Sequence, residues 1–459
     1  MKKFIILFAA TIFFISSVFS EESLISNNKI PGVWLGKMKV SDHLELRFGF
    51  VITEKENGEL SATMNVIEQK AFDIQMDIVT FVNDSLHIEL SAAGISYAGK
   101  YDFETNVIEG TYMQGEANLK LNLHEVDELP RGEVVRPQTP VRPFPYIEEE
   151  VVFENRLEDI KLAGTLTLPR SKSPSPAIIL VAGSGHTDRN ETPMGHFLLL
   201  ADYLTRSGYV VLRYDKRGVG ESTGNYDEAT SFNFAEDVKA GVNYLKNRDD
   251  VDANNIGIFG HSEGALLAPM VASQSENIGF IVLIGAIGIP CDELMLLQTE
   301  KIAKINGVPQ EEITTTLKHY RKYYDIIKSN DDNSTKREKI IESNPEIADG
   351  LLSVMLMPWF QYFIQINPDE YFEKVNCPVL VINGQNDVQC APKENLDRIK
   401  EVFENSGNKD YTIKTLPNLN HLLQTSKSGS PTEYEQITEI IAPSALELMG
   451  NWVNERIKN

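Results

Sequence analysis

One serine of this chain lies between glycines in the pentapeptide Gly260-His261-Ser262-Glu263-Gly264, a G-x-S-x-G pattern. The pentapeptide follows the apolar run 256–259 and precedes 265–268, whose residues favour a helix. A sharp turn from strand to helix lifts a serine hydroxyl out of a sheet, and glycines flank it because the backbone is crowded there. Because so short a pattern also arises by chance, its meaning depends on the residues that accompany it.

A serine hydroxyl becomes a useful nucleophile only when a base takes its proton and an acid holds that base. Asp387 follows the apolar run 379–382, and His421 follows the predicted strand 411–416. Taken singly, Asp387 could be a turn residue and His421 an ordinary loop histidine. However, open parallel sheets place their sites at the carboxyl ends of strands. In a sheet with such a serine turn, the acid should follow a late strand and the base the last strand. The sequence therefore predicts a catalytic triad of Ser262, Asp387 and His421.

Attack by Ser262 on a carbonyl also requires two backbone N–H groups to stabilise the oxyanion. We expect one from Glu263, the residue after the serine, and the other from Ser184 in the glycine-rich loop 182–186. This chemistry requires no metal and no organic cofactor. His186 and Asp188, both in one loop, are only a weak signal for a metal site.

The elements that must position these residues are short apolar strands alternating with helices, which is typical of a mostly parallel sheet covered on both faces. The predicted strands are 177–181, 209–214, 256–259, 280–284, 379–382 and 411–416. The predicted helices are 194–207, 234–247, 263–274, 391–405 and 444–457.

The segment between residues 284 and 379 is too long for a structureless loop. Apolar residues recur at helical spacing from Ile313 to Ile327, so we predict a helical cap over about 290–370. The aromatic stretch 351–366 has two readings. It either packs against the sheet as core or lines an apolar substrate pocket.

The N-terminal part of the chain has a different pattern. From Leu44 to Ile52 apolar residues alternate with others, as in a strand with one buried face, and similar runs follow up to residue 123. This pattern predicts a small all-β barrel or sandwich over 21–125. The proline-rich stretch 126–147 is typical of a linker, which leaves 148–459 for the α/β domain.

The first twenty residues carry Lys2 and Lys3 before the apolar stretch 4–19 and small residues near Ser20. We interpret 1–20 as a cleaved signal peptide rather than an uncleaved anchor, and therefore expect a periplasmic or secreted protein with no integral membrane segment after cleavage. The net charge of −23 argues against a nucleic-acid partner.

The chain has three cysteines, Cys291, Cys377 and Cys390, with no C-x-x-C pattern. We expect buried free thiols, although Cys377 and Cys390 could pair in an exported protein.

The region from about 150 to the C-terminus resembles the α/β-hydrolase superfamily, and most resembles its exported bacterial carboxylesterases of the dienelactone-hydrolase and acyl-aminoacyl-peptidase branch. Residues 181–189 are similar to the H-G-S-G-x-x-D-R oxyanion loop of these enzymes, with Ala182 in place of the usual histidine. Residues 213–222 resemble their loop after the next strand, which is mostly structural. The N-terminal β region is a looser match to their accessory domain.

This resemblance implies a serine esterase that cleaves a small carboxylic ester, of short to medium acyl chain, through an acyl-enzyme. A serine peptidase or thioesterase would use the same triad. A non-catalytic binding protein on a hydrolase scaffold would be indicated by a broken triad, whereas the triad here is complete in sequence.

Overall fold

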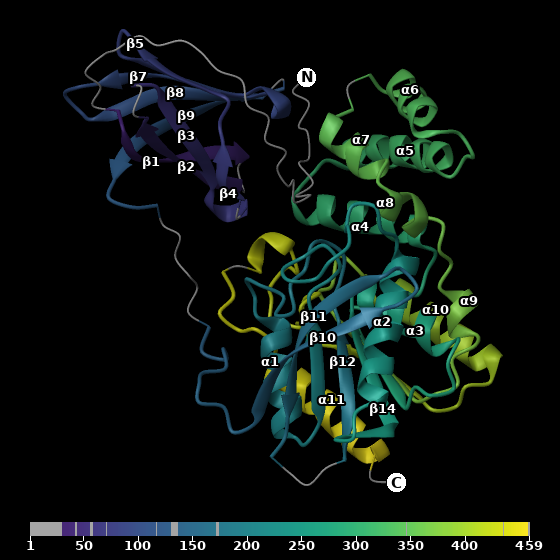
Figure 1. Cartoon of the computed structure of the whole chain (residues 1–459). Helices are drawn as coiled ribbons and strands as arrows, with labels where there is room; N and C mark the ends of the chain where they lie inside the picture. Colours follow the sequence, from purple (N-terminus) through teal and green to yellow (C-terminus); the bar gives the residue numbers. More distant parts are fainter. Residues whose placement is uncertain are drawn as a thin grey trace. The chain divides into compact units, whose positions relative to one another are not determined.

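A computed structural model of the chain describes residues 30–457, except 42–43, 56–57, 70, 116, 130–135, 171–173, 346 and 435 (Figure 1). The predicted signal peptide and residues 130–135 of the predicted linker lie outside the described residues. The chain divides into two compact units, Met1–Glu133 and Val134–Asn459.

The first unit is an antiparallel sheet whose described strands follow the order β4-β3-β2-β1-β9-β8-β7-β6-β5. The strands are β1 Gly32–Ser41, β2 Leu44–Glu54, β3 Leu60–Val66, β4 Ala71–Gln75, β5 Ile78–Val82, β6 Ser85–Leu90, β7 Ile95–Asp102, β8 Val107–Gln114 and β9 Ala117–Val126. Only residues 76–77 separate the two edge strands, β4 and β5, so the sheet must curl until its edges approach. The alternating apolar residues thereby enclose a core that includes Trp34, Phe50 and Tyr97. The predicted all-β fold of this region is confirmed.

The second unit is built on a sheet whose described strands follow the order β10-β11-β13-β12-β14-β15-β16-β17. The strands are β10 Ile147–Asn155, β11 Ile160–Leu168, β12 Ser175–Val181, β13 Val210–Tyr214, β14 Val251–His261, β15 Phe280–Ile284, β16 Val379–Gly384 and β17 Tyr411–Leu416. β10 and β11 pair antiparallel, and the strands from β13 to β17 pair parallel. The predicted mostly parallel α/β sheet is confirmed.

Helices cover both faces of this sheet (Figure 1). They are α1 His196–Arg206, α2 Ser231–Lys246, α3 Glu263–Ala272, α10 Pro392–Ser406 and α11 Pro443–Ile457. Neighbouring strand residues face opposite cores: Ile178 packs with α1 and α11, whereas Ile179 packs with α2, α3 and α10. Because both faces are buried, the strands are nearly continuous apolar runs.

The predicted helical cap is present between β15 and β16 (Figure 1). Its helices are α4 Cys291–Ile305, α5 Gln310–Ile327, α6 Asn333–Ser343, α7 Asp349–Met355, α8 Pro358–Phe363 and α9 Asp369–Phe372. Phe360 and Phe363 of α8 are buried in the core shared with the sheet, which favours the core reading for them, whereas Trp359 is half-buried.

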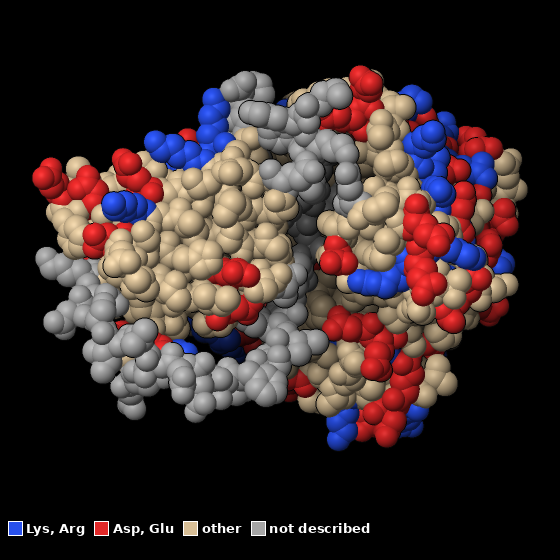
Figure 2. All heavy atoms as spheres, turned by 90° about the horizontal axis from the view of Figure 1, so that it is seen from above, with Lys and Arg blue, Asp and Glu red and all other residues tan. Residues whose placement is uncertain are grey.

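The outer surface of the second unit carries acidic and basic side chains close together, as the right side of Figure 2 shows. On the cap these include the ion pairs Lys328–Asp292 and Lys339–Asp331. Such partly exposed pairs add little stability and are typical of a solvated face. Among the described residues, no helix combines the length and apolar character needed to cross a membrane.

Candidate active site

Ser262 occupies a strained turn between β14 and α3, with φ 56° and ψ −117°. The turn is possible only because glycines precede and follow it. A Cβ atom on Gly260 would lie 2.0 Å from the carbonyl oxygen of Gly264, and one on Gly264 would lie 2.0 Å from that of Val181. Strain of this kind is concentrated at functional sites, and here it presents a half-buried serine at the end of the strand.

Asp387 and His421, which lie far apart in the sequence, meet at the carboxyl end of the sheet. His421 Nδ1 lies 2.8 Å from Asp387 Oδ2, and both residues are buried. The other carboxylate oxygen, Oδ1, accepts hydrogen bonds from the backbone N–H groups of Gln389 and Cys390. With Asp387 fixed in this way, the proton of a neutral imidazole stays on Nδ1, and Nε2 remains available as a base.

The strands bring these side chains toward Ser262. The N–H of Ser262 donates to the carbonyl oxygen of Ile284 at the end of β15, and the N–H of Gly285 donates to that of Ile382 on β16. Gly285 adopts φ 60°, and a Cβ atom there would lie 2.7 Å from the His421 ring. Among the described hydrogen bonds, none joins Ser262 Oγ to His421. In free enzymes this bond is often long, and it tightens when substrate binds.

The loop after β12 passes directly over the serine. A Cβ atom on Gly183 would lie 3.1 Å from Ser262 Cβ and 3.6 Å from its Oγ. The next residue, Ser184, is exposed, and Glu263 begins α3, where the first backbone N–H groups have no partner within the helix. Both predicted oxyanion donors therefore belong to backbone segments beside the nucleophile.

A buried ion pair that the sequence analysis did not predict links these two segments. Lys216 Nζ donates to the carbonyl oxygen of Gly183 (2.9 Å) and lies 3.3 Å from Glu263 Oε2. Burial lowers the pKa of Lys216, while the Glu263 carboxylate acts against that shift. In the sequence, this ion pair could have been sought in the loop 213–222, which contains Lys216. The family resemblance describes that loop as mostly structural.

Glu263 also contacts the cap. Its Oε1 accepts hydrogen bonds from Ser231 Oγ and from Trp359 Nε1 of α8, both at 2.7 Å. The Trp359 ring stacks on Phe363, with ring centroids 5.2 Å apart. Through these contacts, Glu263 links the sheet, α2 and the cap to one another.

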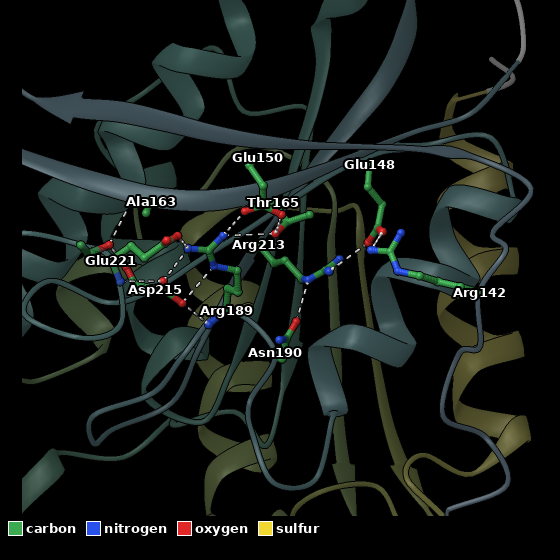
Figure 3. A network of polar contacts seen from close by, with 11 residues as sticks. Arg142, Glu148, Glu150, Ala163, Thr165, Arg189, Asn190, Arg213, Asp215 and Glu221 are labelled. Carbon is green, nitrogen blue, oxygen red and sulfur yellow. Dashed lines mark hydrogen bonds and ion pairs between the residues drawn. The ribbon is translucent and has the colours of Figure 1, made fainter.

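The loop from β12 to α1 is held firmly to β13 by the network in Figure 3. Arg189 forms hydrogen bonds to both carboxylate oxygens of Asp215, and Arg213 Nε donates to the side-chain oxygen of Asn190. The ends of the loop, with Ser184 near one and Glu191 near the other, are thus fixed relative to the sheet.

His186 and Asp188, the weak candidates for metal ligands, have other partners. His186 Nε2 lies 3.2 Å from Asp227 Oδ1, and Asp188 accepts hydrogen bonds from the N–H groups of Asn190 and Thr192. Among the described residues, the group of donor atoms close enough to hold a metal ion is instead Glu191, His196 and His261. Sequence reasoning missed this group because His261 lies far along the chain from Glu191 and His196.

The cysteines are not part of the site chemistry. Cys291, Cys377 and Cys390 are all free thiols, as the sequence analysis expected. Burial raises the pKa of Cys377 to about 12, and it also raises those of Cys291 and Cys390. Since the thiolate is the reactive form, these thiols are poor nucleophiles.

Comparison with known families agrees with this architecture. Residues 175–427, more than half of the chain, match the sequence model of the family Hydrolase_4, described as serine aminopeptidase, S33. The chain belongs to this α/β-hydrolase family. The predicted superfamily is therefore confirmed.

Among curated proteins, this hydrolase is 28% identical over 292 residues to Esterase EstD of Thermotoga maritima, a match that covers 63% of this chain and 65% of EstD. It is 38% identical over 125 residues to an acyl transferase of Photorhabdus luminescens, covering 27% of this chain and 37% of the other. The chain thus spans less than two thirds of the length of these relatives. A solved esterase of Pyrococcus furiosus aligns with a TM-score of 0.43 and 18% identity, over 71% of this chain and 98% of that one.

Proposed function

We propose that this hydrolase cleaves carboxylic esters through an acyl-enzyme formed on Ser262. The observation that carries the proposal is the meeting of a strained serine turn with a buried His421–Asp387 pair at the carboxyl ends of neighbouring strands. The similarity to EstD, a protein named as an esterase, supports the choice of an ester over other acyl substrates.

In this mechanism Ser262 Oγ attacks the ester carbonyl carbon while its proton passes to His421 Nε2. Asp387 keeps the imidazole oriented and stabilises its cation. The N–H groups of Glu263 and Ser184 bind the oxyanion. The C–O bond to the alcohol then breaks, and His421 returns the proton to the leaving oxygen. Water, deprotonated by His421, attacks the acyl-enzyme and releases the carboxylic acid and free Ser262.

The cap supports a substrate of short to medium acyl chain. Phe360 and Phe363 are already buried in the core, so the aromatic residues that α8 leaves for a substrate are the half-buried Trp359 and Tyr362. The leader at residues 1–20 supports action outside the cytoplasm, in the periplasm or the medium.

The test is hydrolysis of p-nitrophenyl acetate, butyrate and octanoate, together with labelling by a fluorophosphonate and peptide mapping. Ser262→Ala should lower kcat by about 10⁴-fold or more and abolish the label. Ser273→Ala, beyond the far end of α3, is the matched control, since its hydroxyl donates to the Met270 carbonyl within its own helical turn. Turnover near wild type in Ser262→Ala would refute the nucleophile.

The description of the matched family favours one alternative, an aminopeptidase on the same triad. Amino-acyl p-nitroanilides distinguish the two. We expect kcat/KM for the esters to exceed that for the anilides, and the reverse order would replace the proposal by a peptidase.

A further inference from the structure

Behind the loop that carries His421 lies a buried cluster that the proposed reaction does not use. His196 Nδ1 lies 3.1 Å from Glu191 Oε2, and His261 Nδ1 lies 3.6 Å from Glu191 Oε1. Both histidines are buried, at 1% and 6% exposure. Their rings lie 5.2 Å apart, so one carboxylate faces two imidazoles in a space largely closed to water.

The remaining nitrogen of each ring bonds the base loop. His196 Nε2 lies 2.9 Å from the carbonyl oxygen of Leu422, and His261 Nε2 lies 3.2 Å from that of His421. A carbonyl oxygen can only accept, so both Nε2 atoms donate. Two successive backbone carbonyls, at the catalytic histidine and the residue after it, are thereby held by two imidazoles.

For His196 the other partner is also an acceptor. A proton shared between His196 Nδ1 and Glu191 Oε2, which lie 3.1 Å apart, joins the ring to the carboxyl group. Burial alone would raise the pKa of Glu191, but hydrogen bonds from His196 and His261 hold it well below its ordinary value. Lys216 adds a further positive charge in the neighbourhood.

The backbone is bent to make this contact. Glu191 adopts φ 54°, in the left-handed region that side chains disfavour, and the preceding residues Arg189 and Asn190 are tied to β13 (Figure 3). Backbone strain at a single residue persists only when contacts with the surrounding structure compensate for its energy. Here those contacts lead directly to the catalytic centre.

We propose that Glu191, His196 and His261 are positioning residues that hold the backbone at His421 and Leu422, so that the imidazole faces the serine. His261 directly precedes Ser262, and the centroid of its ring lies 4.9 Å from that of the His421 ring. His261 therefore connects the proposed nucleophile to the proposed base. The inference rests on the proposed function, because it assigns His421 as the base. The described polar contacts of these three side chains go to one another and to backbone carbonyls, not to Ser262 Oγ or His421 Nε2.

The test compares His261→Ala, His196→Ala and the conservative His261→Gln, whose amide N–H can still reach the His421 carbonyl. With p-nitrophenyl butyrate, each alanine variant should lower kcat by about 10²-fold, since a base displaced by about 1 Å costs that much. KM should stay within about threefold, because substrate contacts are unchanged. His261→Gln should recover most of kcat. Glu191→Gln, of the same shape, should lower kcat without a loss of fold.

Asn408→Ala is the matched control for a general loss of stability. Asn408 is buried, and its side chain also bonds two backbone carbonyls, those of Val375 and Cys377, at 3.0 and 3.1 Å. The variant should be less stable yet keep the wild-type kcat. A folded His261→Ala with wild-type kcat, or an equal loss of kcat in Asn408→Ala, overturns the positioning role.

If the proposed function itself is wrong, the result differs from a failure of the positioning role alone. The wild type would then neither hydrolyse the ester nor take the fluorophosphonate label. A metal measurement completes the test, since the same three side chains could hold a divalent cation. We expect EDTA to leave activity unchanged. One equivalent of bound zinc, whose removal abolishes activity, would replace the hydrogen-bonded cluster by a metal site.

Discussion

The ion pair between Lys216 and Glu263 allows a sharp test of how the proposed oxyanion site is held in place. The two side chains are only 5% and 1% exposed, and their charged atoms lie 3.3 Å apart. Removing one partner of such a pair costs about 3–5 kcal/mol of unfolding free energy, because the other charge stays buried without it. Removing both leaves no unpaired charge, so the double variant should cost less than the sum.

The structure also ranks the two single variants. In Lys216→Met, Glu263 keeps the hydrogen bonds from Ser231 and Trp359, so the loss should be near 3 kcal/mol. In Glu263→Gln, the ammonium of Lys216 loses the carboxylate and keeps uncharged contacts with the Gly183 carbonyl and the rings of Tyr226 and Phe234, so the loss should be nearer 5 kcal/mol. The coupling energy should be about 3 kcal/mol.

The pH dependence of Glu263→Gln has a definite sign. Burial lowers the pKa of Lys216 in the folded state, so the unfolded state binds more protons. The stability of this variant should therefore rise as the pH is raised from 6 toward the ordinary lysine pKa of about 10.4. The wild type should show a weaker rise.

The assay is urea unfolding followed by tryptophan fluorescence. The chain has three tryptophans, and a Trp34→Phe background leaves Trp359 and Trp452, which both lie in the second unit. Kinetics on p-nitrophenyl butyrate are measured in parallel, and kcat should fall more in Lys216→Met, in which the Gly183 segment loses its anchor, than in Glu263→Gln, in which Lys216 keeps that contact. Additive effects, or single losses below about 1 kcal/mol, would refute the coupled buried pair.

Three further predictions concern single contacts. Gly264→Ala should yield little folded protein, because the new Cβ would lie 2.0 Å from the Val181 carbonyl oxygen, whereas Gly279→Ala, with contacts of 3.4 Å, should fold normally when yield and Tm are compared. Asp215→Asn should destabilise by about 3 kcal/mol at neutral pH, because Arg189 loses its buried partner. Although burial alone raises it, hydrogen bonds from Arg189 lower the pKa of Asp215, so the difference from wild type should shrink as the pH falls below about 4 in urea titrations. Trp359→Phe keeps an aromatic ring but removes a hydrogen bond to a carboxylate, which should cost about 1.5–3 kcal/mol, and an unchanged Tm would contradict this.

The strands that carry the site were readily predicted, because they are short apolar runs bounded by polar turns. The predicted strands 280–284 and 411–416 have the bounds of β15 and β17. β14 is longer than its apolar run, since it begins at Val251, which pairs with Ser175 before a register shift leads to the pair Ala177–Ile256. Pairing with a neighbour extended this strand beyond what its own residues indicate.

The order of Ser262, Asp387 and His421 was predictable, because each follows a recognisable strand. Their side-chain geometry was not, since it depends on turns such as Gly285 that the local sequence does not specify. The assignment of these residues as a triad remains a prediction for the experiments above.

The supporting residues carried almost no signal in the sequence. His261 occupied a variable position of the G-x-S-x-G pattern, and Glu191 looked like an ordinary loop residue. Their roles arise from contacts between segments 70 residues or more apart, which only the folded backbone brings together. Likewise, the aromatic stretch 351–366 does not act as one unit. Pro358 begins α8, and within this helix Phe360 is buried in the core whereas Trp359 donates a hydrogen bond to Glu263.

The separation of the sheet from the cap has a consequence for how substrate preference can change during evolution. His421, Asp387 and the oxyanion segments are held by contacts within the sheet and its loops, whereas the cap meets the residue after the nucleophile through the indole of Trp359. Selection for a new substrate can therefore act on cap helices while the reactive groups stay unchanged. Grafting caps from relatives onto this sheet should alter chain-length preference more readily than it alters the rate of acyl transfer.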